Sequence, residues 1–188
     1  MDNIPNSDIH KILDSALDSG FPGKNGTLNT SLTVCLWLKI LAIAPGYEKL
    51  NLFQKAGGGG YSYSLWISPT PSEWTLSMNL SETGGPSYDG AGDAHGSVLL
   101  INKWYHIAFT VGGGSYRFRI FDNDAEAILG VDKTGLGTFA VADGYLRSYA
   151  GYYDEPCSML LDEMVVFNRV LTVEEIDKVR AGNYVYIP

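Results

Sequence analysis

Apolar side chains alternate with polar ones at a period of two along several short segments of this chain. That period is typical of β-strands, because successive side chains of a strand point to opposite faces. The clearest segment spans residues 32–40, where Val34 and Leu38 share one face and Cys35 and Trp37 share the other. Because both faces carry bulky apolar groups, we predict that this strand lies in the interior of a sheet.

The remaining strand patterns are short and are separated by turn residues. They span residues 50–55, 61–67, 74–80, 103–111, 116–121 and 158–167. Glycine runs at 57–60 and 112–114 interrupt them, and the second run predicts a hairpin between its two neighbouring strands. We predict surface loops over residues 81–96 and 143–156, and loops of such length often carry function.

One helix follows the last strand pattern. Thr172 and Glu175 have the spacing of a capping box, in which each side chain bonds the backbone amide of the other residue. Leu171 and Ile176 occupy the positions of a hydrophobic staple, and Gly182 suits the left-handed end of the helix. A short helix after a run of strands indicates an all-β sandwich and argues against alternating βαβ units.

The length of 188 residues suits one undivided β-sandwich. We predict a single domain over residues 1–188, in which residues 1–31 form an irregular N-terminal segment rich in Asp, Asn, Ser, Gly and Pro. The first residues lack the basic and apolar regions of a signal peptide, and no later segment has the length of a membrane span. We therefore expect no signal peptide in this chain and no membrane insertion.

The charge of the chain excludes one class of partner. The net charge is −8 and the pI is about 4.7. Nucleic acid is a poor partner for such a chain, because contacts between basic side chains and phosphates supply most of the affinity. The same argument disfavours docking on anionic lipid.

Two cysteines, Cys35 and Cys157, leave the thiol chemistry of the chain open. The pair permits one disulfide but does not demand it. Cys35 also lies inside an apolar strand pattern, where a buried free thiol is common. Both alternatives remain open at the level of the sequence.

The end of the chain carries a long, ordered motif. Residues 161–176 read Leu-Asp-Glu-Met-Val-Val-Phe-Asn-Arg-Val-Leu-Thr-Val-Glu-Glu-Ile. This segment closely resembles the closing strand and helix of the laminin-G-like, concanavalin-A-like superfamily of lectins and glucanases. Weaker matches follow the family order at 32–39, 53–60 and 104–108, so that the resemblance covers roughly residues 32–182.

The resemblance implies an all-β, two-sheet antiparallel jelly-roll sandwich with one short C-terminal helix. It also implies structural contacts for Asp162 and Glu163, an ion pair between Arg169 and one of them, and a packed His106. The superfamily includes glucanases and alginate lyases, but the Glu-x-Asp-x-x-Glu strand of the laminarinase-like enzymes does not occur here. The three histidines are not clustered either. We therefore expect a protein that is not an enzyme.

Carbohydrate binding is the first function that fits such a domain. The partner would be a glycan or cell-surface polysaccharide, because sugars stack on aromatic planes and their hydroxyls bond to carboxylates and amides. The candidate ligand-binding residues are Trp74, Tyr88, Asp89, Tyr149, Tyr152, Tyr153 and Asp154. Trp66 is a further candidate, although packing on the sheet is the alternative for both tryptophans.

The second function is that of a structural or capsid-decoration protein of a virus or phage particle, acting through contacts with neighbouring subunits. Either function places the chain in the extracellular space or on a virion surface. The resemblance also implies calcium, because many members of the superfamily bind it. Its oxygen ligands would include Asp18, Asn25 and Asp162.

Overall fold

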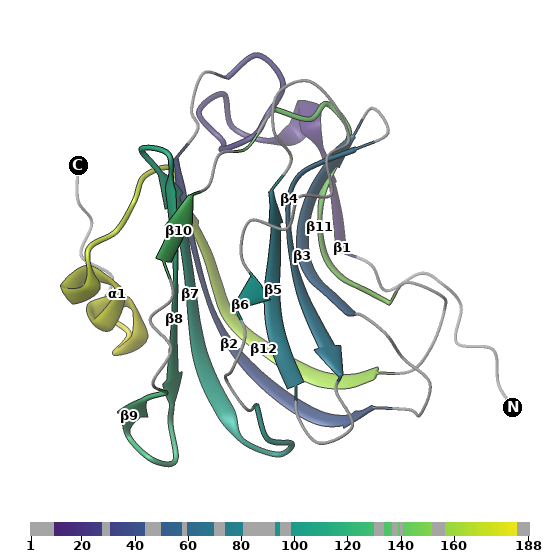
Figure 1. Cartoon of the computed structure of the whole chain (residues 1–188). Coiled ribbons are helices and arrows are strands. Elements are labelled where there is room, and N and C mark those ends of the chain that lie inside the picture. The colour runs from purple at the N-terminus through teal and green to yellow at the C-terminus, as the bar shows by residue number, and fades with distance from the viewer. Residues whose placement is uncertain are drawn as a thin grey trace, which may run out of the picture.

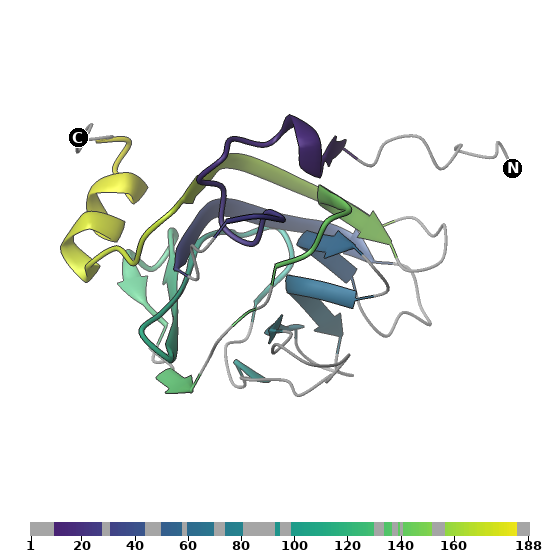
Figure 2. The ribbon, with the colours of Figure 1, turned by 90° about the horizontal axis from the view of Figure 1, so that it is seen from above.

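A computed structural model describes residues 10–27, 31–43, 50–57, 60–69, 74–80, 93–94, 99–129, 134–136, 139, 141–151 and 157–183 of the chain. In this part of the chain, two antiparallel sheets enclose one core, and one helix lies outside the second sheet (Figure 1). Viewed from above, the second sheet separates this helix from the first sheet (Figure 2). The arrangement confirms the predicted all-β sandwich with one short C-terminal helix.

The first sheet has the strand order β1-β11-β3-β4-β5-β6. Its strands are β1 (His10–Leu13), β3 (Leu50–Gly57), β4 (Gly60–Pro69), β5 (Trp74–Leu80), β6 (Asp93–Ala94) and β11 (Tyr145–Gly151). β3, β4 and β5 are antiparallel neighbours in chain order. β11 comes from much later in the chain and lies between β1 and β3.

The second sheet has the strand order β10-β8-β7-β2-β12, with β9 paired to β8. Its strands are β2 (Leu32–Ile43), β7 (Trp104–Gly112), β8 (Ser115–Asp122), β9 (Ala127–Ile128), β10 (Thr134–Leu136) and β12 (Cys157–Phe167). β2 lies between β7 and β12, which confirms the predicted interior strand. The predicted hairpin is also confirmed, because β7 and β8 are joined through Gly113 and Gly114, which both have positive φ.

The core lies between the two sheets and uses one face of each central strand. From β2, Val34, Leu36 and Leu38 are at most 1% exposed. The first sheet contributes Phe53 and Tyr63, whose rings stack with centroids 5.7 Å apart. Burying a large apolar side chain contributes about 1.5–3 kcal/mol, so that this face holds the sheets together.

The closing strand β12 contains a β-bulge, because its register against β2 shifts between Asp162 and Val165. Glu163 lies in the bulge with a φ of 46°. The extra residue exchanges the two faces of the strand, so that Val166 packs against the core and Phe167 packs on the outer face. The period-two pattern predicted over residues 158–167 is therefore interrupted at the bulge.

Helix α1 spans Val173–Arg180 and begins with the predicted capping box. The Thr172 hydroxyl accepts from the Glu175 amide at 3.3 Å, and the Glu175 carboxylate accepts from the Thr172 amide at 2.9 Å. At the other end, Gly182 has a φ of 72°. The predicted start and end of the helix are therefore confirmed.

The helix packs on the outer face of the second sheet. Leu171 and Ile176, the predicted staple, are buried there together with Cys35. Cys35 is a free thiol opposite Val165, whereas Cys157 begins β12 opposite Ile43, at the other end of the strand pair. This separation excludes a disulfide between Cys35 and Cys157, because a disulfide needs Cα atoms within about 7 Å. Cys35 is therefore the buried free thiol of the two alternatives.

The N-terminal segment is more ordered than the sequence predicted. It contains β1 and the 3₁₀ turn Asp14–Ala16. Asp14 lies 2.7 Å from the ammonium group of Lys55, which is fully buried and also donates to the carbonyl of Ala142. The prediction of an irregular segment over 1–31 is therefore wrong for residues 10–16, because pairing with β11 and this buried ion pair order them.

Both predicted surface loops contain strands. β6 lies within residues 81–96, of which the structure describes only 93–94, and it pairs with β5. β11 occupies Tyr145–Gly151 within the predicted loop 143–156. The loop prediction is wrong for residues 93–94 and 145–151, because these strands form by pairing with other segments and show little alternation of their own.

Candidate functional site

A row of large side chains crosses the outer face of the second sheet. Asp162 on β12 lies opposite Trp37 on β2, which lies opposite His106 on β7. His106 in turn lies opposite Phe121 on β8. Trp104 lies on the same face of β7, one strand period before His106, because the buried Tyr105 between them faces the core.

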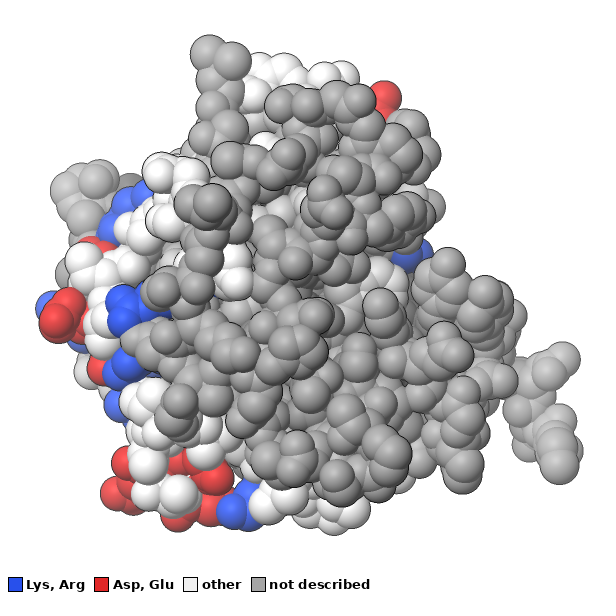
Figure 3. Space-filling model, in the orientation of Figure 1, with Lys and Arg blue, Asp and Glu red and all other residues white. Residues whose placement is uncertain are grey.

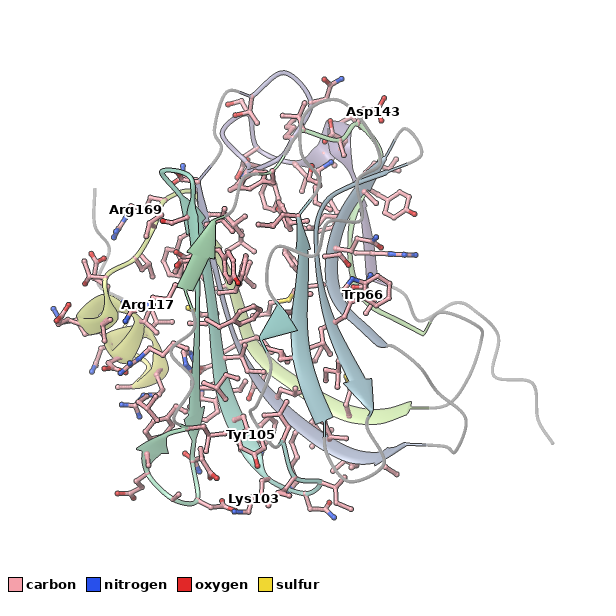
Figure 4. The ribbon with its side chains drawn as sticks, in the orientation of Figure 1. Trp66, Lys103, Tyr105, Arg117, Asp143 and Arg169 are labelled. Atoms are coloured by element: carbon pink, nitrogen blue, oxygen red, sulfur yellow. The ribbon has the colours of Figure 1, made fainter. Side chains whose placement is uncertain are left out.

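Helix α1 leaves part of this face uncovered, and a pocket opens beside its C-terminal end. The pocket has a volume of about 410 Å³ and is lined by Trp37, Trp104, Asn123, Asp162, Glu163, Arg180, Ala181 and Gly182. We call it the tryptophan pocket. Lys103 and Tyr105, which flank Trp104 in the sequence, mark the end of the second sheet at which it lies (Figure 4).

The lining of the tryptophan pocket divides into an aromatic part and a polar part. Trp37 and Trp104 are partly exposed, whereas Asn123, Asp162 and Glu163 are exposed. The aromatic rings thus offer flat apolar surface, and the amide and carboxylate groups around them remain able to form hydrogen bonds.

His106 supports the Trp37 ring from the side. The two ring centroids are 5.2 Å apart with an interplanar angle of 66°, an edge-to-face contact. His106 is 3% exposed, which confirms the predicted packed histidine. Burial, reinforced by the positive charge of Arg180, lowers the pKa of the imidazole to about 4. The ring beside Trp37 is therefore neutral at pH 7.

Arg180 forms the wall of the tryptophan pocket on the side of the helix. Its guanidinium carbon lies 3.8 Å from the centroid of the Phe121 ring, and its Nε lies 3.5 Å from Oδ1 of Asp177. Asp177 Oδ2 also accepts from Arg119 at 3.1 Å. The helix thus ties itself to β8 by charge as well as by packing. The described charged side chains in Figure 3 gather on this side of the molecule.

The contacts of Asp162 and Glu163 differ in part from those implied by the family resemblance. Arg169 pairs with Glu175 through two hydrogen bonds of 2.9 Å and with neither of these carboxylates, which corrects the predicted ion pair. One structural contact is present, because Asp162 Oδ1 accepts from the Glu163 amide at 2.8 Å. Both side chains are otherwise exposed at the tryptophan pocket.

Most of the ligand-binding residues that the sequence nominated lie in segments that the structure does not describe, so they stay a prediction. Tyr88, Asp89, Tyr152, Tyr153 and Asp154 lie outside the described residues. The backbones of Trp74 and Tyr149 are described, on β5 and β11 of the first sheet. Trp66, also on the first sheet, is 4% exposed (Figure 4). Of the two alternatives for this tryptophan, packing on the sheet is therefore the one that the structure supports.

The three residues suggested for calcium lie in two places. Asp18 and Asn25 belong to the N-terminal segment, and Gly20 between them approaches Asn168, just beyond β12. Asp162 lies near the middle of that strand, roughly 20 Å from Asn168 at about 3.3 Å per residue. Among the described residues, no three His, Cys, Asp or Glu side chains form a group that could hold a metal ion. Calcium binding stays a prediction.

The lining residues that were not nominated from the sequence include Trp37, Trp104, Asn123 and Arg180. The alternation along β2 already placed Trp37 away from the face of Val34 and Leu38. What the sequence lacked was the register between β2 and β7, which brings the two tryptophans onto one patch.

Comparison with known families gives one match over most of the chain. The family model described as the concanavalin A-like lectin/glucanases superfamily matches residues 17–177. The comparison with curated protein sequences gives no match.

Solved structures with a similar fold share little sequence with this chain. A sialidase of Trypanosoma rangeli, in complex with the inhibitor DANA, has a TM-score of 0.51 and 15% identity over 80% of this chain and 22% of the sialidase chain. The CBM2 module of the evolved Dit of Lactobacillus casei BL23 phage J-1 has a TM-score of 0.46 and 15% identity, covering 84% of this chain and 66% of that one. The binding domain of botulinum neurotoxin serotype G has a TM-score of 0.47 and 10% identity, covering 81% and 36% of the two chains.

The chain thus spans about a fifth of the sialidase chain that it matches. At such identities the likeness concerns the fold.

Within the described part of the chain, no helix has the length and apolar character needed to cross a membrane.

Proposed function

Because the chain belongs to the concanavalin A-like lectin/glucanase superfamily, we propose that it is a non-catalytic recognition module that binds carbohydrate in the tryptophan pocket. The natural setting of such a module is the extracellular space or a virion surface. The ligand would be a glycan or cell-surface polysaccharide.

One observation carries this proposal, the presence of two partly exposed tryptophans among exposed polar groups. The C–H faces of a pyranose ring stack on indole planes, and Trp37 and Trp104 offer two such planes in one pocket. The Asn123 amide and the two carboxylates of the β12 bulge supply hydrogen bonds that orient hydroxyl groups. Aromatic surface with a few converging polar groups is the usual composition of small-ligand sites.

The arrangement of carboxylates supports a role without catalysis. Retaining and inverting glycosidases place their two carboxyl groups on either side of the scissile bond, about 5–9.5 Å apart. Asp162 and Glu163 are consecutive residues of one bulge and share a wall of the tryptophan pocket. A pair on one wall does not flank a bound glycosidic bond.

A glycan array followed by titration calorimetry tests the proposal. We expect the chain to bind at least one class of glycan, and Trp37→Ala and Trp104→Ala each to weaken binding by at least roughly tenfold, as for buried aromatic anchors in other interfaces. Tyr145→Ala is the matched control, because Tyr145 is a partly exposed aromatic on the first sheet. Circular dichroism reports whether each variant is folded. Absence of glycan binding, or equal losses in all three variants, would refute the proposal.

The same array with and without EDTA tests the calcium prediction. Loss of binding with EDTA, restored by added calcium, would support a bound ion. Unchanged binding would show that recognition needs no calcium.

A second function, assembly through protein contacts, is favoured by one feature of the first sheet. Its edge strand β1 exposes Ile12 and Leu13, which are 46% and 59% exposed. An apolar edge strand is a ready site for pairing with another chain. Light scattering distinguishes the functions, since a multimer that becomes a monomer when Leu13 is replaced by Lys, and that binds no glycan, would support assembly.

A further inference from the structure

The β12 bulge holds a residue in an unfavourable backbone conformation beside the tryptophan pocket. Glu163 has a φ of 46°, in the left-handed region where the Cβ atom of an L-residue is crowded. Glycine adopts this conformation without that cost. Strained residues persist where the surrounding structure enforces them, and they cluster at binding sites.

The bulge presents two carboxylates at one place. Without it, Asp162 and Glu163 would point to opposite faces of the strand, one of them toward the core. In the structure both are exposed and both line the tryptophan pocket. The hydrogen bond of 2.8 Å from the Glu163 amide to Asp162 Oδ1 holds the bulge in this shape.

The Glu163 carboxylate is not engaged elsewhere in the described part of the chain. Arg169, the cation expected to pair with this bulge, is held by Glu175. Arg180 on the opposite wall is engaged with Phe121 and Asp177. Lys39, one strand period from Trp37 on the same face of β2, lies opposite Trp104 and Leu160. No ion pair with Asp162 or Glu163 is present among the described residues.

The helix brings one cation to the site, Arg180, together with the negative pole of its dipole. Ala181 and Gly182, at the C-terminal end of α1, line the same pocket. That end of a helix carries the negative pole of its dipole. Among the lining side chains, a ligand over the two tryptophans therefore meets the carboxylates of Asp162 and Glu163 and the guanidinium of Arg180, two negative charges against one positive charge.

We infer that Glu163, positioned by Asp162, is the specificity-determining residue of the tryptophan pocket and selects neutral, hydroxyl-donating sugars over acidic ones. This inference rests on the proposed carbohydrate binding. A sugar ring stacked on Trp37 or Trp104 donates hydroxyl hydrogens to the Glu163 carboxylate. A uronic or sialic acid brings a like charge to the same place and is repelled.

Replacing Glu163 by Gly separates strain from recognition. The Glu163→Gly variant should have an unchanged or higher Tm, because glycine relieves the left-handed backbone, and should bind a neutral oligosaccharide from the array at least tenfold more weakly. A residue with only a structural role would not lose affinity while keeping or gaining stability. Glu163→Gln, which keeps the side chain but removes its charge, should reduce discrimination against glucuronic acid oligosaccharides.

Glu126 provides the matched control. It is an exposed glutamate with a φ of 48° in the turn between β8 and β9, outside the lining of the tryptophan pocket. Glu126→Gly should change the Tm in the same direction as Glu163→Gly and leave glycan affinity unchanged.

The outcomes separate this inference from the proposed function. If the unmodified chain binds no glycan, both fail. If it binds and Glu163→Gly binds equally well, or if it prefers acidic sugars, this inference fails and carbohydrate binding stands.

Discussion

Arg169 and Glu175 share two parallel hydrogen bonds of 2.9 Å that join the end of β12 to the first turn of α1. The same Glu175 carboxylate accepts from the Thr172 amide. The Arg169 guanidinium, with help from that amide, lowers the pKa of Glu175 to about 2. The Glu175 carboxylate thus connects Arg169, two residues beyond the end of β12, to the N-cap residue of the helix.

We expect the Arg169–Glu175 pair to stabilise the fold in a pH-dependent way. The pKa of Glu175 is lower in the folded chain than its ordinary 4.5, so its contribution is complete above pH 4.5 and is lost as the pH falls toward 2. The Glu175→Gln variant should be less stable at pH 7 by no more than about 1 kcal/mol, because the pair is partly exposed. Urea unfolding at pH 7 and pH 2.5 measures this. A difference that persists undiminished at pH 2.5 would contradict the assignment.

His106 should make the folded chain less stable in mild acid. Its pKa is about 4 in the folded chain against an ordinary 6.5, so between these values the unfolded chain binds a proton that the native imidazole does not. The free energy of unfolding should then fall by roughly 3 kcal/mol as the pH drops from 7 to 4. In the His106→Leu variant this fall in the free energy of unfolding between pH 7 and pH 4 should be absent. An imidazole NMR signal that titrates near pH 6.5 in the native chain would refute the prediction.

Lys55 and Asp14 should be strongly coupled, because the Lys55 side chain is fully buried and lies 2.7 Å from the Asp14 carboxylate. Asp14→Ala leaves a buried ammonium group unpaired and should cost about 3–5 kcal/mol. Adding Lys55→Met should recover most of that loss. Lys103→Met is the control, since its pairs with Asp122 and Asp124 are 3.7 Å long and partly exposed, and it should cost less than about 1 kcal/mol. Additive losses in the double variant would contradict the coupling.

Cys35 should be unreactive in the native chain. It is fully buried under α1, and burial raises the pKa of its thiol to about 12. Iodoacetamide at pH 8 should therefore label Cys35 only after unfolding in guanidinium, as read by peptide mass spectrometry. Rapid labelling of the native chain, or a peptide that links Cys35 to Cys157 after oxidation, would contradict the burial of Cys35 under α1.

Local patterns in the sequence were sufficient for the elements that form from neighbouring residues. Alternation located β2 and β7, the glycines at 113 and 114 located the hairpin, and the Thr172 cap located the helix. In each case the information lies within a few residues, because strand period, turn conformation and helix capping are local properties.

Strands that depend on distant partners were not predicted. The sequence of β11, Tyr-Leu-Arg-Ser-Tyr-Ala-Gly, shows little alternation of apolar and polar residues, and the strand is ordered by pairing with β1 and β3 on either side. The bulge at Glu163 was missed for a related reason. Nothing in the residues of β12 reveals that its register against β2 shifts, yet that shift decides which of Val166 and Phe167 enters the core.

The sequence by itself determined the fold class, the family and the capped helix of this protein. The tertiary structure alone decided where the tryptophan pocket, the proposed binding site, lies. Trp37 and Trp104 are far apart in the chain, and each looks like an ordinary strand residue. They meet in one pocket because β2 and β7 pair in a single register, and the pocket stays open because α1 ends before covering them. Both relationships arise from contacts between distant segments.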